Sequence, residues 1–168
     1  RCWASAGSPC RDGFAVEFLA TINAPGVRQM TALSGRRILL GLTGGIAAYK
    51  SAELLRLLVK AGCDVRVVMT ESACRFITPV TMQALSGQTV FTDLWDSRIP
   101  DNMAHIELSR DRDMIVVAPA SADFIAKITH GLADDLLSTL CLARECGLML
   151  GPAMNRQMWE NPATLRNV

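Results

Sequence analysis

The chain has 168 residues, half of them hydrophobic, so it can bury the core of one domain but is too short for two domains of ordinary size. Its 17 Lys and Arg residues nearly balance its 16 Asp and Glu residues, and this balance speaks against a nucleic-acid-binding protein. No apolar run approaches the ~18–20 residues that a membrane-spanning helix needs, so the sequence predicts no membrane partner.

Residues 1–29 differ in pattern from the rest of the chain. They show no sustained hydrophobic period and no signal-peptide order of charged, apolar and small residues. Met30 then opens a short polar lead-in, and we expect it to be the natural start. We expect residues 1–34 to be a disordered leader and residues 35–168 to form the domain. A transit peptide is the alternative interpretation of the leader.

Short apolar strands alternate with amphipathic helices from residue 37 onward. Strands are predicted over 37–43, 65–69, 89–91, 114–118 and 148–150, and helices over 46–61, 71–77, from Thr78-Pro79, over 122–129 and over 134–145. Apolar strands separated by helices are typical of a parallel sheet covered on both faces. The predicted fold class is therefore α/β, a three-layer α/β/α sandwich with a parallel, Rossmann- or flavodoxin-like sheet that is truncated at its C-terminus.

The cysteine and histidine content predicts neither a disulfide framework nor a metal site. The six cysteines form no CxxC pair, and only two histidines are present. Buried free thiols of a cytoplasmic protein are the preferred interpretation of the cysteines, which are Cys2, Cys10, Cys63, Cys74, Cys141 and Cys146.

Ligands of parallel α/β sheets bind beyond the carboxyl ends of the strands, so the residues after each strand are candidates for a binding site. Gly44 and Gly45 follow the first strand and would let backbone N–H groups approach an anion, although their spacing fits neither a dinucleotide fingerprint nor a P-loop. A plain tight turn is the alternative. Hydroxyl and amide groups follow three other strands, at 70–72, 119–124 and 152–159, where helix capping is the alternative. Together these strand ends predict a cradle for a phosphorylated ligand.

From about Gly35 onward the chain resembles the homo-oligomeric flavin-containing cysteine decarboxylases. Within that family it is most similar to the phosphopantothenoylcysteine decarboxylase half of the bacterial bifunctional enzyme of coenzyme A synthesis. Four segments carry the resemblance in the family's order: GGIAAYK at 44–50, HIEL at 105–108, Pro119-Ala-Ser-Ala-Asp-Phe124 at the PASANT motif, and a complete PxMNxxMW motif at 152–159. Asp123 stands where PASANT has Asn, which exchanges an amide donor for a carboxylate acceptor.

The resemblance implies FMN-dependent decarboxylation of 4′-phosphopantothenoylcysteine to 4′-phosphopantetheine. In the family, FMN oxidises the cysteine moiety to a thioaldehyde, carbon dioxide leaves, and the reduced flavin returns the electrons. The resemblance also implies that His105 is the acid/base, that Asn155 holds the substrate carboxylate and that Met154 packs beside it. The cofactor contacts that it implies are Gly44, Gly45, Ile46, Thr70, Glu71, Ser72, Ser121, Ala122, Asp123, Phe124 and Ala153.

The family's assembly implies a homotrimer, or a homododecamer of four trimers, with FMN at the subunit interface. In relatives a cysteine on a downstream flap donates the last proton; none of the six cysteines is assigned to that role, so we expect only the oxidative half-reaction to run well. Three alternatives remain: a peptidyl-cysteine decarboxylase of peptide-antibiotic maturation, a non-catalytic flavin-binding regulator of a protein phosphatase, and a flavodoxin-type electron carrier. A structural role is the alternative for His105 and the only interpretation of His130.

Overall fold

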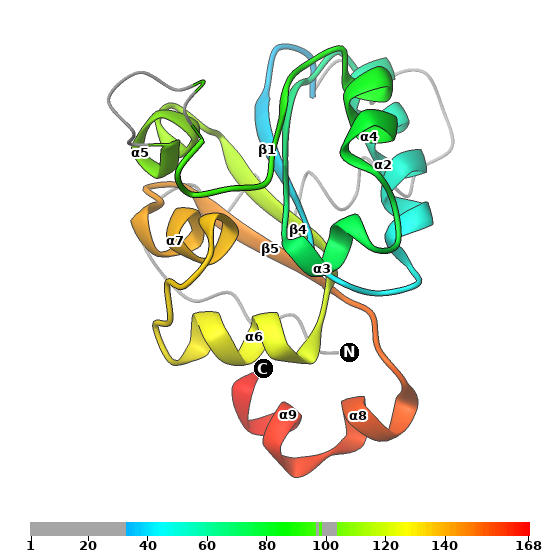
Figure 1. Ribbon diagram of the computed structural model, residues 1–168, viewed down its shortest axis with the longest axis vertical. Coiled ribbons are helices and arrows are strands. Elements are labelled where there is room, and N and C mark those ends of the chain that lie inside the picture. Colours follow the sequence, from blue (N-terminus) through cyan, green and yellow to red (C-terminus); the bar gives the residue numbers. More distant parts are fainter. Residues whose placement is uncertain (1–32, 97, 99–103) are drawn as a thin grey trace.

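The computed structural model describes residues 33–96, 98 and 104–168, coloured in Figure 1. The predictions for Met30 and for residues 1–32 lie outside these residues. Leu33, the first of them, is buried in the core. The backbone N–H of Gly35 donates to the carbonyl of Gly62 at 2.8 Å, which fastens this entry segment to the turn after the first long helix.

The centre of the fold is a parallel sheet in which five strands take the order β3-β2-β1-β4-β5. The strands are β1 (Arg37–Leu42), β2 (Asp64–Met69), β3 (Val90–Phe91), β4 (Met114–Ala120) and β5 (Gly147–Pro152). This order confirms the predicted Rossmann-like parallel sheet. The chain leaves β1 toward one edge and re-enters at β4 on the other side of β1, so the topological switch point lies between β1 and β4.

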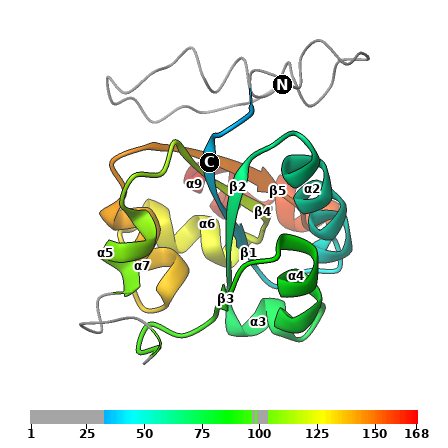
Figure 2. The ribbon, with the colours of Figure 1, turned by 90° about the horizontal axis from the view of Figure 1, so that it is seen from above.

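Helices cover both faces of the sheet, as Figure 2 shows. The helices α2 (Ala48–Lys60) and α4 (Pro79–Ser86) cover one face, and α5 (Ala104–Ser109), α6 (Ala122–Thr129) and α7 (Leu136–Ala143) cover the other. The short α3 (Glu71–Cys74) follows β2, and α8 (Arg156–Glu160) and α9 (Pro162–Asn167) follow β5. The last turn of α9 is tied to α6 because the Thr129 hydroxyl donates to the carbonyl of Asn167 at 2.7 Å.

The apolar run of β1 shows why the sheet is buried on both sides. Ile38, Leu40 and Leu42 enter the core cluster under α2 and α4, whereas Leu39 enters the cluster under α6 and α7. Side chains of successive strand residues point to opposite faces, so a continuous apolar run fills two cores. Gly41 is the exception, since a Cβ there would lie 2.5 Å from Cδ1 of Leu137 in α7. A small residue at this position lets α7 lie close to the sheet.

The structure differs from the sequence-based expectation in its short helices. The predicted helix over 71–77 ends at Cys74, and α5, α8 and α9 were not predicted at all. These three helices have only five or six residues each, too few for a hydrophobic period to be visible in the sequence. Within the described residues, no helix is long and apolar enough to cross a membrane, and no group of three or more His, Cys, Asp or Glu could hold a metal ion.

The described cysteines should differ strongly in reactivity. Burial raises the pKa of Cys141 to about 12, and burial with the nearby Asp113 raises the pKa of Cys63 to about 11. The thiolate is the nucleophile, so the raised pKa and the lack of access both slow the reaction of these two thiols. We expect iodoacetamide to label both residues far more slowly in the native protein than in urea, with half-buried Cys74 labelled sooner, as peptide mass spectrometry would measure. Rapid native labelling of Cys141 would contradict the buried position.

Candidate functional site

Most residues predicted for the site follow the carboxyl ends of β1, β2, β4 and β5, around the switch point between β1 and β4; His105, in α5, does not follow a strand directly. After β1 the chain enters α2 on one face, and after β4 it enters α6 on the other. Two adjacent connections that diverge in this way leave a crevice between them, which is where open α/β sheets bind their ligands.

Thr43 joins the two connections. Its buried hydroxyl donates to the carbonyl of Pro119 at 2.7 Å and accepts the backbone N–H of Ser121 at 2.9 Å. Its own backbone N–H also donates to Pro119 O, at 3.2 Å. One side chain thus fixes the end of β1 against the start of α6. Thr43 was predicted as the last residue of the first strand and was not singled out; in the structure β1 ends at Leu42 and Thr43 follows it directly.

The glycine turn after Thr43 lies against two other strand ends. A Cβ at Gly44 would lie 2.6 Å from Cβ of Ser72, and one at Gly45 would lie 4.0 Å from both the carbonyl oxygen of Ala153 and Cγ of Pro119. Residues after β1, β2, β4 and β5 therefore meet at one place, as the strand-end pattern predicted. The glycine at 44 is required by the close approach of Ser72.

The turn that leads into α2 offers unpaired backbone donors. Its N-cap, Ala47, provides no side-chain hydrogen bond, and the backbone N–H groups of Gly44, Gly45 and Ile46 make none within the described part of the chain. Ile46 is 79% exposed. Free N–H groups at the start of a 13-residue helix attract an anion, because the helix dipole adds to their partial positive charge.

The residues after β2 form the wall opposite this turn. Thr70 caps α3 by accepting the N–H of Ala73 on its hydroxyl at 3.2 Å, so the capping interpretation holds for Thr70. Its hydroxyl keeps a proton that it can donate to a ligand. Ser72 is exposed beside Gly44, and the exposed Glu71 pairs with Arg75 at 3.3 Å.

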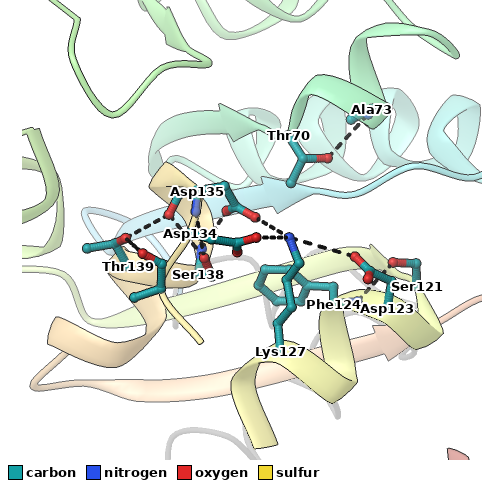
Figure 3. Close-up of polar contacts among 11 residues, drawn as sticks. Thr70, Ala73, Ser121, Asp123, Phe124, Lys127, Asp134, Asp135, Ser138 and Thr139 are labelled. Carbon is teal, nitrogen blue, oxygen red and sulfur yellow. Dashed lines mark hydrogen bonds and ion pairs between the residues drawn. The ribbon is translucent and has the colours of Figure 1, made fainter. Parts of the chain in front are cut away.

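The segment after β4 combines capping with an exposed carboxylate (Figure 3). Ser121 caps α6 by accepting the N–H of Phe124 at 3.2 Å, and Ala122 begins the helix. The side chain of Asp123 is 79% exposed, whereas Phe124 is buried in the core under α6. Of these residues, Phe124 serves mainly the packing of α6, and Asp123 is the one that presents a charge.

Ala153, Met154 and Asn155 lead from β5 into α8. The N–H of Ala153 donates to the carbonyl of Ala120 at 3.1 Å, which keeps this segment beside the end of β4. Met154 is half-buried against the core. Asn155 is exposed and caps α8, its Oδ1 accepting the N–H of Gln157 at 2.8 Å. The amide nitrogen of Asn155 therefore remains available as a donor to a ligand.

His105 lies in the first turn of α5 and is half-buried. Its Nδ1 is buried and has no hydrogen-bond partner among the described residues. The helices α5 and α8, which carry or follow His105 and Asn155, lie far apart in both views (Figures 1 and 2). A single copy of the chain thus assembles the strand-end cradle but does not bring its two catalytic candidates together.

Lys127 is a second residue that sequence reasoning missed. Its ammonium lies 3.0 Å from Asp134 and 3.2 Å from Asp135, the N-cap of α7, and 3.9 Å from Asp123 (Figure 3). The hydrogen bond to Asp134, and then that to Asp135, raises the pKa of Lys127 despite its partial burial. The spacing of four between Asp123 and Lys127 on a helix was a signal for this contact.

Comparison with known proteins identifies the family of this chain. The family model described as Flavoprotein matches residues 27–168. The coenzyme A biosynthesis bifunctional protein CoaBC of Haemophilus influenzae is 53% identical over 136 residues, which cover 81% of this chain and 34% of that protein. The chain thus spans about a third of the length of this curated relative.

Two solved structures have the same fold. The FMN-dependent cysteine decarboxylase SpaF is 35% identical with a TM-score of 0.76, over 80% of this chain and 78% of that one. A PPC decarboxylase mutant complexed with pantothenoylaminoethenethiol is 37% identical with a TM-score of 0.72, over 79% of this chain and 75% of that one. With the family model matching over most of its length, the chain belongs to the flavoprotein family.

Proposed function

We propose that this chain binds FMN and is a carboxy-lyase that decarboxylates 4′-phosphopantothenoylcysteine to 4′-phosphopantetheine in coenzyme A biosynthesis, in the cytoplasm. The observation that carries the proposal is the 53% identity to a CoaBC protein, over a segment whose fold also matches a PPC decarboxylase structure. The domain over residues 35–168 would carry this activity.

The cradle fits a phosphorylated cofactor. The free N–H groups at the start of α2 suit a phosphate, and the hydroxyls of Thr70 and Ser72 stand opposite them. Ser121 and Ala153 border the same crevice from the ends of β4 and β5. When bound, FMN would supply the two-electron chemistry that turns the cysteine carboxylate into a leaving group. The chain itself would bind, orient and move protons.

Asn155 would orient the substrate. With Oδ1 occupied by the N–H of Gln157, its amide nitrogen can donate to the carboxylate that is lost. Capping also holds the side chain in one rotamer, so the donor is already oriented before the substrate arrives. Met154, packed against the core, would form the apolar side of this pocket.

His105 would hold and move the proton of the substrate thiol. Histidine exchanges protons near neutral pH, and Nδ1 of His105 has no protein partner among the described residues that would compete for the proton. Because α5 and α8 lie far apart, His105 and Asn155 of one copy would not act on one substrate molecule. We therefore infer a homo-oligomer, a trimer or a dodecamer, in which His105 of one copy faces Asn155 of another.

A peptidyl-cysteine decarboxylase is the second candidate function. The cysteine decarboxylase SpaF matches with a TM-score of 0.76 and the PPC decarboxylase mutant with 0.72. The fold by itself therefore does not discriminate between a peptide substrate and a pantothenoyl substrate. The identity of 53% to a CoaBC protein favours the pantothenoyl substrate over the 35% to SpaF. Supplying each substrate in turn, as 4′-phosphopantothenoylcysteine or as a peptide ending in cysteine, discriminates between them.

The test is an anaerobic visible spectrum of the protein with FMN, before and after addition of 4′-phosphopantothenoylcysteine. We expect bound flavin whose absorbance bleaches on mixing, and we expect His105→Asn to abolish the bleaching while flavin stays bound. His130→Asn is the matched control, because His130 is exposed at the C-cap of α6. Bound flavin that bleaches only with the peptide would assign the second function. A protein that binds no FMN would refute both.

A further inference from the structure

Asp123 would place a negative charge close to the proposed binding site of an anionic cofactor. It lies in the first turn of α6, two residues after Ser121, and its side chain is 79% exposed. FMN carries a phosphate, so a bare carboxylate bordering its site would repel the cofactor. At this position the PASANT motif has a neutral Asn. A positive charge held close to Asp123 would reduce this repulsion.

Lys127 lies close enough to Asp123 to supply a positive charge beside its carboxylate. One turn along α6 from Asp123, its ammonium lies 3.9 Å from Oδ2 of that residue, close enough for an ion pair but too far for a direct hydrogen bond. The Lys127 side chain is only 21% exposed, so its position is restrained and its charge is less screened than that of a mobile surface lysine.

Two further carboxylates fix where the ammonium sits. Asp134 and Asp135 hold it at 3.0 and 3.2 Å from the loop that precedes α7. Asp135 has a second task, because its Oδ1 accepts the N–H of Ser138 at 2.8 Å and caps α7 (Figure 3). The starts of α6 and α7, whose dipoles favour negative charge, also stabilise Asp123 and Asp135. Of the three, Asp123 lies nearest in the chain to Ser121, whose backbone N–H donates to Thr43 at the proposed site.

We propose that Lys127 is a positioning residue of the FMN site: its ammonium, which Asp134 and Asp135 also contact, holds the carboxylate of Asp123 in place and offsets part of its charge, so that an anionic cofactor can bind next to it. The pair Asp123–Lys127 would replace the neutral Asn of the PASANT motif. Lys127 acts through Asp123 and contacts no ligand itself. This inference rests on the proposed FMN site and adds to it the residue that sets its charge.

A double-mutant cycle on FMN affinity tests the proposal, with four proteins: wild type, Lys127→Gln, Asp123→Asn and the double variant. We expect Lys127→Gln to weaken FMN binding on the order of fivefold at low salt, with a smaller loss at high salt. In the Asp123→Asn background the same change should cost less than about twofold. Lys127→Arg should retain wild-type affinity, and Lys60→Gln, an exposed lysine in the last turn of α2, is the matched control.

The cycle separates this role from a structural one. If Lys127 only braced the loop before α7, Asp123→Asn would not rescue Lys127→Gln, and an equal loss in both backgrounds would overturn the proposal. If circular dichroism shows that Lys127→Gln does not fold, the single variant Asp123→Asn tests the proposal instead. We expect this variant to bind FMN about twofold more tightly than wild type, and weaker binding than wild type would overturn the proposal. A wild type that binds no FMN would refute the proposed function, whereas wild-type binding without coupling refutes only the role of Lys127.

Discussion

Replacing Asn155 by Asp is expected to lower kcat/KM for 4′-phosphopantothenoylcysteine on the order of a hundredfold or more. The substitution keeps Oδ1, which accepts the N–H of Gln157 at 2.8 Å, so α8 remains capped. It exchanges the amide donor for a second carboxylate oxygen, which repels the substrate carboxylate. Release of carbon dioxide under single-turnover conditions, with the protein in excess, measures the loss, and the free energy of unfolding should stay within about 0.5 kcal/mol of wild type.

The chain offers a matched control for this variant. Asn161 caps α9 as Asn155 caps α8, with Oδ1 accepting the N–H of Ala163 at 2.9 Å, and it is also exposed. Asn161→Asp makes the same chemical change at the next helix start and should leave kcat/KM unchanged. Equal activity of the two variants would show that the donor of Asn155 has no part in substrate binding.

Replacing Thr43 by Val is expected to destabilise the protein by about 1–3 kcal/mol and to weaken FMN binding together with it. Valine fills the same space but leaves the carbonyl of Pro119 and the N–H of Ser121 without the hydroxyl that joins them at 2.7 and 2.9 Å. Because Ser121 caps α6, the start of this helix would lose its fixed position at the crevice. Urea unfolding and FMN titration measure the two effects.

Thr43→Ser separates the hydroxyl from the methyl group. Serine restores both hydrogen bonds, so FMN affinity should return to within about twofold of wild type, and only the packing of one methyl should be lost, about 1 kcal/mol. If Ser and Val at position 43 weaken FMN binding equally, the hydroxyl does not join the two connections in the way that the distances indicate.

The sequence was most informative where the residue pattern is local. A run such as Ile38 to Leu42, apolar at every position, is typical of a strand buried on both faces, and the glycines after it predict a turn that approaches other backbone. All five strands, and the meeting of the residues that follow β1, β2, β4 and β5, were therefore predictable. The short helices α5, α8 and α9 were not, because five or six residues are too few for a helical period to show.

The residues of the site also divide into those that local sequence motifs indicate and those that only long-range contacts reveal. Four motifs in the order of the family that the chain resembles, with Gly44, His105, Ser121 and Asn155 among their residues, could be recognised in the sequence, and all but the one with His105 lie close after a strand. That Thr43 bridges Pro119 and Ser121, that Lys127 is shared by three carboxylates of two helix starts, and that α5 and α8 lie apart are long-range facts. By itself the sequence determined the alternating elements and the residues at the strand ends. Only the tertiary structure decided which of those ends touch, since contacts between residues distant in the chain depend on the strand order and on the packing of the helices over it.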